Sequence, residues 1–266
     1  MKHQDPADDR PGAQTLRRGL AILKLLALYP GQGLRISEIG RRLQLAKATA
    51  VRLTRTLADE GFVTQDPATR LYRLGPEAYA VGLAAEPAYA LQRLAAPLLR
   101  SLALETGDWV FFSVRQGHEV ICLSRESGDI PYPASALKVG DRHPVGLGAG
   151  GVALLAAMPD DEVEAVLAHN AATIARDHPR ATVPVIRALV QETREKGYSV
   201  IPGIIVRGYW GLGVPLLDDA GQPVAAIVLV SSAARLNLAR SAALGERMRR
   251  LAQELTTRSR AEAQPG

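Results

Sequence analysis

The residues with the clearest chemistry are polar ones that recur between residues 47 and 55. Lys47, Thr49, Arg52 and Arg55 lie off the apolar stripe of this segment, so a helix here would present them together on its polar face. Ammonium and guanidinium groups contact phosphates, and arginine also reads base edges. Most charge runs are only solvated helix faces. The flanking elements decide between the two interpretations.

A second segment with chemical capacity is GLGAGG at 146–151, which matches the spacing G-x-G-x-x-G. A dinucleotide site would also need a buried strand directly before the glycines and an acidic residue closing the next strand. Neither is present in the sequence. Glycines that open a helix still expose backbone N–H groups to a small anion such as a carboxylate. A glycine turn that only packs closely on a sheet is an equally good interpretation.

The other reactive residue types form no catalytic or metal-binding pattern. The five histidines are scattered without metal-ligand spacing, and we expect His118 at a hairpin turn and His169 near a helix end, both at the surface. The single cysteine, Cys122, lies in the apolar alternation VICLS, which predicts a buried structural thiol. We therefore predict no enzyme activity, no cofactor and no metal.

The cations of 47–55 belong to a pattern of two short helices joined by a tight turn, over residues 36–60. Ile36, Ile39 and Leu43 share one helical face, and a second apolar stripe with Leu45, Val51, Leu53 and Leu57 follows the break. Residues 63–75 then alternate like a β-hairpin with Arg70 near its tip. An amphipathic helix precedes Pro30. This order predicts a winged helix-turn-helix, with the second helix in a major groove and the hairpin as the wing.

At this point the chain resembles the IclR-type bacterial transcription regulators. The resemblance is carried by TLRRGLAILKLL, ISEIGRRLQLAKATAVRLTRTLADEGFV and RLYRLG, and later by REKGYSV and VPLLDDAGQPVAAI. It implies a DNA-binding regulator with a GAF-like sensor domain that binds a small effector. Gln44 stands where the family usually has glycine in the turn, so a left-handed residue there would carry some strain. The DNA-contacting set that we predict is Arg18, Arg35, Lys47, Ala48, Thr49, Arg52, Arg55, Arg70 and Arg73.

The resemblance also places the effector pocket at the glycine-rich segment, where Ala149 and Gly150 would present N–H groups. Polar positions of the family pocket are apolar or glycine here, which favours a partly apolar ligand such as an aromatic acid, with Trp210 or Trp109 as a flat wall. Loss of effector binding is the competing interpretation. The predicted effector set is Leu137, Gly148, Ala149, Gly150, Gly151, Ile201, Trp210, Gly211, Val228 and Val230.

Composition agrees with these expectations. The chain has 266 residues, of which 47% are hydrophobic and 22% charged, which is typical of globular proteins. No apolar run is long enough to span a bilayer and no hydrophobic signal region precedes the first helix, so we expect a cytoplasmic protein. Residues 15–75 hold eleven Lys or Arg against four Asp or Glu, a net charge of +7. One basic module beside a slightly acidic one is typical when a single domain meets nucleic acid.

We predict four segments: a disordered tail over 1–14, the winged helix-turn-helix over 15–75, a linker helix over 76–88, and an effector-binding and oligomerisation domain over 89–260. In the last, helices are expected near 149–158, 160–169 and 182–197. A hairpin is expected with strands in 108–116 and 119–125, and further strands in 198–201, 210–216 and 223–230. Hairpins mixed with helices indicate an α+β fold with an antiparallel sheet.

The predicted function is a transcription regulator whose affinity for double-stranded DNA responds to a small effector. The predicted pocket residues favour an organic acid with a partly apolar body. A palindromic operator implies a homodimer or a dimer of dimers, with the first helix and the linker helix as the candidate contact surface. Two alternatives stay open at this stage. One is an NAD(P)-dependent oxidoreductase that uses the 146–151 loop, and the other is a winged-helix adaptor for protein contacts.

Overall fold

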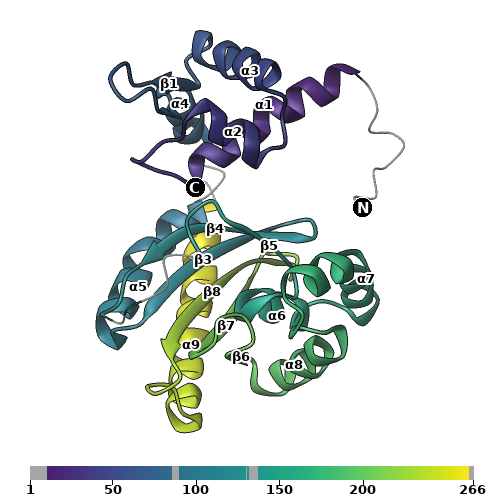
Figure 1. Ribbon diagram of the computed structural model, residues 1–266. Coiled ribbons are helices and arrows are strands. Elements are labelled where there is room, and N and C mark those ends of the chain that lie inside the picture. The colour runs from purple at the N-terminus through teal and green to yellow at the C-terminus, as the bar shows by residue number, and fades with distance from the viewer. Residues whose placement is uncertain (1–10, 86–89, 130, 132–136, 264–266) are drawn as a thin grey trace. The chain divides into compact units, whose positions relative to one another are not determined.

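The computed structural model describes residues 11–85, 90–129, 131 and 137–263. The chain divides into two compact units, Met1–Ala88 and Tyr89–Gly266 (Figure 1). The elements of the first unit are α1 (Pro11–Ala27), α2 (Ile36–Arg42), α3 (Lys47–Asp59), β1 (Val63–Gln65), β2 (Tyr72–Leu74) and α4 (Pro76–Ala85). This is the predicted order of a winged helix-turn-helix, and β1 and β2 pair antiparallel as its wing.

A small apolar core holds the first unit together. Ile22 on α1, Ile39 on α2 and Leu53 on α3 are buried in it together with Val63 of the wing. The periodicity that predicted these helices is therefore the pattern of one shared core. Val51 was expected in the same stripe, but this is wrong because 43% of its surface is exposed. It lies instead on the cationic face of α3.

The two ends of this unit differ from the expected boundaries. The predicted disordered tail is wrong for residues 11–14, which form the first turn of α1, and residues 1–10 lie outside the described part. The linker helix is present as α4, and residues 86–88 of the predicted linker also lie outside the described part. No residue of α4 is buried, so this helix contributes little to the core of its own unit.

The second unit is an antiparallel sheet with helices on both faces. Its strands are β3 (Trp109–Gln116), β4 (Glu119–Glu126), β5 (Arg142–Pro144), β6 (Ser199–Pro202), β7 (Tyr209–Leu217) and β8 (Pro223–Ser232), in the order β5-β4-β3-β8-β7-β6. Its helices are α5 (Ala90–Thr106), α6 (Gly148–Ala156), α7 (Asp160–Asp177), α8 (Val183–Lys196) and α9 (Leu238–Ala263). The predicted α+β class and antiparallel sheet are confirmed.

Alternation along the strands separates two cores. Helices α5 and α9 cover one face of the sheet, over Phe112, Leu212 and Ile227, while α6 covers the other, over Phe111 and Val228 (Figure 1). The helices and strands expected from the sequence are present, except that the three-residue edge strand β5 was missed and α7 is longer than expected. This two-faced packing places the N-terminal end of α6 on the sheet, where the glycine-rich segment lies.

Candidate functional site

The exposed face of α3 carries the cations predicted from the sequence. Lys47 and Ala48 in its first turn, and Arg52 and Arg55 further along, are exposed, whereas Thr49 is half-buried. Arg52 and Arg55 are three residues apart and therefore share one side of the helix. Neither guanidinium takes part in the ion pairs formed among the described residues. Both side chains are free to reach into a groove.

The turn before α3 has the strained geometry expected for a residue other than glycine. Gln44 has a φ of 55°, in the left-handed region that a β-carbon disfavours, which confirms the prediction. Helix α3 begins after Ala46 without a side-chain cap, so its first N–H groups remain available to a phosphate oxygen. Arg35, whose backbone N–H donates to Glu38 Oε2 at 3.0 Å, and Arg18 on α1 are both exposed.

Asp66 shapes the tip of the wing. Its Oδ1 accepts the backbone N–H groups of Ala68 and Thr69, each at 2.9 Å. The hydrogen bonds from Thr69 are the main reason that the pKa of Asp66 lies below its ordinary value. Arg70 follows with a φ of 60° and an exposed side chain. Arg73 is half-buried, with Nη1 4.0 Å from Asp66 Oδ2, so it is less available to DNA than the sequence suggested.

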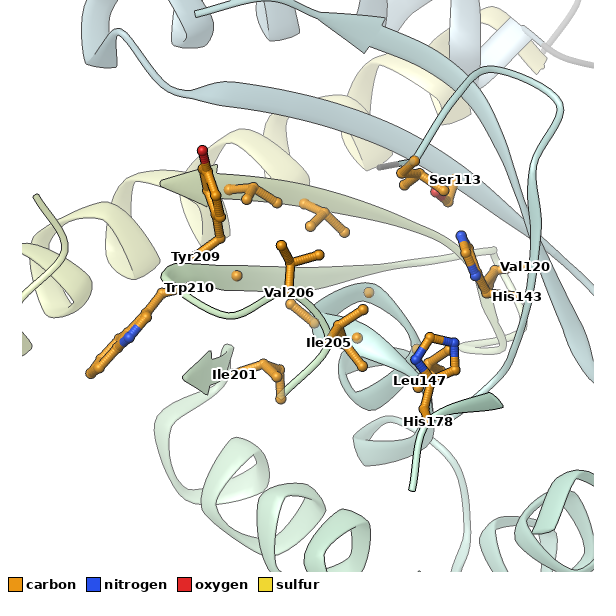
Figure 2. Close-up of a pocket in the computed structure, with 18 residues that line it drawn as sticks. Ser113, Val120, His143, Leu147, His178, Ile201, Ile205, Val206, Tyr209 and Trp210 are labelled. Atoms are coloured by element: carbon orange, nitrogen blue, oxygen red, sulfur yellow. The ribbon is translucent and has the colours of Figure 1, made fainter. Parts of the chain in front are cut away.

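The second unit contains a cavity of about 330 Å³ between α6 and the sheet (Figure 2). This is within the range of roughly 300–1,000 Å³ found for small-molecule sites. All ten residues predicted for the effector pocket lie along its wall. Eight residues that were not predicted from the sequence also line it: Ser113, Val120, His143, Leu147, His178, Ile205, Val206 and Tyr209.

Glycines on β7 let α6 approach the sheet closely. A β-carbon on Gly213 would lie 2.4 Å from the carbonyl oxygen of Ala149, and one on Gly211 would lie 3.1 Å from the β-carbon of Ala149. The buried hydroxyl of Ser199 on β6 donates to the same Ala149 carbonyl at 2.7 Å. The first turn of α6 is therefore held directly on the backbone of the sheet, facing the cavity.

The start of α6 gives the cavity an electropositive region. Leu147 precedes the helix and makes no side-chain capping hydrogen bond. The N–H groups of Gly148, Ala149 and Gly150 thus have no partner one turn back in the helix, and these three residues line the cavity. Unpaired N–H groups at a helix N-terminus favour an anion. The predicted N–H donors therefore belong to residues that line a cavity, and the glycine-rich segment is not only a turn packed against the sheet.

Polar side chains gather at one end of the cavity. Ser113, His143 and His178 lie at the same end as Leu147, whereas Tyr209 and Trp210 lie at the other end (Figure 2). Burial is the main reason that the pKa of His143 lies below its ordinary value, and His178 lowers it further against the opposing effects of Asp141 and Glu119. The sequence contained no signal for this set, because its members come from β3, β5 and the loop after α7.

The aromatic wall differs from the one expected. The indole of Trp210 points away from the cavity (Figure 2) and packs with the core on the α5 and α9 face. Trp109 is not among the described residues that line the cavity, and its ring lies under the Arg125 guanidinium at 4.6 Å. Tyr209 provides the aromatic side chain at this end instead, and its hydroxyl donates to the carbonyl of Pro131 at 2.6 Å.

The remaining reactive residues have structural surroundings. Cys122 is buried as predicted, and burial raises the pKa of its thiol to about 12. His118 lies at the hairpin turn between β3 and β4 and His169 is exposed, as predicted, but His169 is not near a helix end because α7 continues to Asp177. The two imidazole rings stack with their centroids 4.0 Å apart. Among residues with described positions, no three His, Cys, Asp or Glu side chains come together in a way that could hold a metal ion.

The dinucleotide alternative for residues 146–151 is wrong. The strand before the glycines is β5, a three-residue edge strand that pairs antiparallel with β4. A dinucleotide fold requires a buried parallel strand there, followed by a helix and a second parallel strand.

No helix within the described ranges is long and apolar enough to cross a membrane.

A winged helix-turn-helix with an exposed cationic helix, joined to a sheet domain with a small-molecule-sized cavity, defines a DNA-binding regulator with a sensor domain. The comparisons with known proteins agree. The model of the bacterial transcriptional regulator IclR C-terminal domain matches residues 88–257, and that of the IclR helix-turn-helix domain matches residues 15–67. The chain belongs to the IclR family of transcription regulators.

Individual relatives extend over nearly the whole chain. The HTH-type transcriptional repressor AllR of Klebsiella pneumoniae is 30% identical over 256 residues, which cover 96% of this chain and 92% of the relative. One similar crystal structure is that of an IclR homolog from Microbacterium hydrocarbonoxydans complexed with 4-hydroxybenzoate. Its sequence is 25% identical to this chain, the TM-score is 0.75, and the match covers 93% of this chain and 99% of the homolog. An IclR regulator structure from Alicyclobacillus acidocaldarius has a TM-score of 0.75 at 24% identity, covering 92% of this chain and 98% of its own.

Proposed function

We propose that this transcription regulator changes its affinity for a palindromic operator when an organic acid with an apolar, aromatic-sized body binds in the cavity of the second unit. The observation that carries the proposal is the N-terminus of α6, which opens into a cavity lined mainly by apolar groups. The similar regulator with 4-hydroxybenzoate bound supports an aromatic acid as the ligand class. The predicted DNA-contacting residues on α3 and the wing are the proposed reading surface.

The apolar walls favour the body of such a ligand over a small hydroxy or keto acid. Ile201 and Val228 are buried against α6, and Val230 is half-buried beside them. Burying an aromatic ring against these side chains stabilises the complex by roughly 25 cal/mol for each Å² of apolar surface removed from water. The Ala149 and Gly150 N–H groups would then meet the carboxylate, together with polar side chains of the cavity wall that compensate its charge.

The first prediction tests this site with the full chain and fluorescently labelled operator DNA. We expect 4-hydroxybenzoate or a related aromatic acid to shift the operator affinity, and Val230→Asp to weaken acid binding by at least about tenfold through desolvation and like-charge repulsion. DNA binding without the acid should persist. The measurements are calorimetry for the acid and fluorescence anisotropy for the DNA.

Leu217→Asp is the matched control, since Leu217 is partly exposed on neighbouring β7 and does not line the cavity. It should leave acid binding unchanged. Because coupling between two sites is reciprocal, operator DNA must change the acid affinity by the same factor as the acid changes the DNA affinity. If Val230→Asp leaves acid binding and its effect on DNA intact, the effector binds elsewhere.

We also propose a homodimer or dimer of dimers. Leu16 and Leu20 on α1 are 64% and 45% exposed, and they lie one helical turn apart on the same face. On α4, Tyr79, Val81 and Leu83 are exposed as well. Exposed apolar faces of this kind mark contact surfaces, and a symmetric dimer matches the symmetry of a palindromic operator.

The second prediction concerns this surface. The double substitution Leu16→Asp and Leu20→Asp should convert the dimer to monomers in sedimentation velocity and weaken operator binding, because it places two charges in the proposed apolar contact surface. Leu104→Asp is the control, since Leu104 is 77% exposed on α5 in the second unit. Dissociation by Leu104→Asp alone, with an intact dimer after the α1 substitutions, would assign dimerisation to the second unit instead.

A further inference from the structure

One end of the cavity carries polar side chains in addition to the N-terminus of α6. Ser113 on β3 is buried, with 5% of its surface exposed, and lines the cavity. No hydrogen bond of its hydroxyl to another described residue is present. Strand β3 carries an irregularity in its pairing with β4 between Phe112 and Ser113, and such bulges redirect side chains. The Ser113 hydroxyl thus lines the cavity without a partner among the described residues and is available to donate to a ligand there.

Two imidazoles face the same end. His143 on β5 and His178 after α7 both line the cavity and are half-buried (Figure 2). Within the described residues neither imidazole makes a hydrogen bond. His178 is held by its backbone, whose N–H donates to the carbonyl of Ile174 at 2.7 Å and whose carbonyl accepts from Ala181 at 2.8 Å. Both rings are therefore positioned by the fold and still have nitrogens to offer.

The histidines are the lining side chains that can become positively charged, since no Lys, Arg, Asp or Glu is among the described residues of the cavity wall. Nearby cations outside the wall have partners. Arg142 bonds to Glu119 and Gln116, and Arg125 lies over Trp109. A carboxylate that leaves water for this cavity needs a compensating charge, and the partial charge of a helix N-terminus supplies only about half of one.

We propose that His143 and His178, with Ser113, form the acid-recognition end of the cavity, where an imidazole takes up a proton from solvent when an organic acid binds. This inference rests on the proposed effector site. The acid stays ionised, one imidazole becomes an imidazolium beside its carboxylate, and no covalent bond changes. Ser113 donates its hydroxyl hydrogen to the ligand.

The electrostatic surroundings determine the direction of the pH dependence. The charged and titratable groups that act on His143 are Asp141 in the preceding loop, Glu119 on β4 and His178, and burial keeps the pKa of His143 below its ordinary value. Asp177, next to His178, is already bonded to Arg176. A bound carboxylate raises the pKa of the facing imidazole, so the complex binds more protons than the free protein. Affinity must then rise as the pH falls from the pKa of the complex towards that of the free protein.

The third prediction is tested by calorimetry on the full chain with benzoate, phenylacetate and 4-hydroxybenzoate at pH 8, 7 and 6. The carboxylates stay ionised over this range, because their pKa values lie near those of side-chain carboxyls, about 4. Each rise of one unit in the imidazole pKa gives up to about a tenfold gain in affinity. We expect about tenfold tighter binding at pH 6 than at pH 8, and uptake of up to about one proton measured in two buffers of different ionisation enthalpy.

The double substitution His143→Asn and His178→Asn should bind the same acids with one affinity at all three pH values and without proton uptake. His169→Asn is the matched control, because His169 stacks on His118 and does not line the cavity, and it should keep the wild-type pH dependence. If the double variant does not fold, NMR titration of the wild-type histidine ring protons with and without benzoate measures the same rise in pKa directly.

These experiments distinguish the proposed acid-binding site from the proposed proton uptake by its histidines. The proposed proton uptake by His143 or His178 would be overturned if an acid bound the wild type with equal affinity from pH 8 to 6. It would also be overturned if the pH dependence persisted in the double variant. Either result would still leave an organic acid as the effector. Failure of all three acids to bind even at pH 6 would overturn both this inference and the proposed effector class.

Discussion

Replacing Asp108 with alanine is expected to lower the free energy of unfolding of the second unit by about 3 kcal/mol. The side chain of Asp108 is fully buried at the start of β3. Its Oδ2 accepts from Arg240 Nη2 on α9 at 2.6 Å, and its Oδ1 accepts from Ser231 Oγ on β8 at 2.7 Å. The Nε of Arg235 lies 3.8 Å from Oδ1. One carboxylate therefore joins α9, β8 and the start of β3.

The size of the effect follows from what the deletion leaves behind. Removing one partner of a buried ion pair typically costs about 3–5 kcal/mol, because the other charge stays without compensation. Arg235 and Arg240 keep some contact with water and still donate to the carbonyl of Thr106, which places the expected loss at the lower end. Asp108→Asn keeps the shape and one acceptor, so it should lose less.

Urea denaturation followed by tryptophan fluorescence measures this, since both tryptophans, Trp109 and Trp210, belong to the second unit. The matched control is Asp219→Ala, which removes the carboxylate partner of Arg260 from an exposed pair. Exposed pairs contribute about 0–1 kcal/mol, so the control should unfold almost as the wild type does. If the urea midpoint of Asp108→Ala equalled that of the wild type, the contacts of Asp108 with Arg240 and Ser231 would not stabilise the fold.

The DNA-binding unit could be predicted from the sequence because its signals are local. Each helix shows the 3.6-residue period of a face that packs into one small core, as at Ile22, Ile39 and Leu53. The same periodicity failed at Val51, which is exposed between cationic neighbours. An apolar residue on a recognition helix has a second use, contact with a thymine methyl group, which periodicity does not distinguish from burial.

The effector cavity could be predicted only in part. The glycine-rich segment and the apolar positions on the last strands were found from their resemblance to a family, and the structure brings all of them to one cavity. Ser113, His143 and His178 were missed because they are far apart in the sequence and belong to no motif. Their common position depends on the three-residue strand β5 and on the length of α7, two features that local patterns underestimated.

Removing both Arg52 and Arg55 from the regulator is expected to weaken operator binding by at least about 30-fold. Both side chains are exposed on α3, lie three residues apart, and take no part in the ion pairs of the described residues. A side chain that reads a base contributes on the order of 1–3 kcal/mol, and each 1.4 kcal/mol is about tenfold in affinity. The first turn of α3, with Lys47 and uncapped N–H groups, would meanwhile hold a phosphate.

The measurement is fluorescence anisotropy on an operator isolated from genomic fragments by repeated selection, carried out over a range of salt concentrations. Wild-type affinity should fall steeply with salt, because each phosphate contact releases counterions. If Arg52 and Arg55 read bases, their alanine variants should lose the preference for the operator over unrelated DNA. Arg70→Ala on the wing should instead weaken binding to the operator and to unrelated DNA by the same factor. It should also reduce the slope of log affinity against log salt concentration by about one, the value for one lost phosphate contact.

Arg250→Ala is the control for net charge in the single alanine variants of Arg52 and Arg55, since Arg250 is exposed on α9 in the second unit and its removal also deletes one positive charge. It should leave operator affinity within about twofold, because an exposed charge that does not contact the DNA is largely screened at physiological salt. An operator affinity that stays at the wild-type value after both Arg52 and Arg55 are removed would mean that another surface reads the DNA. The wing and the N-terminus of α3 would then have to carry specificity as well as orientation, and the Arg70→Ala variant would lose the operator preference that it is expected to keep.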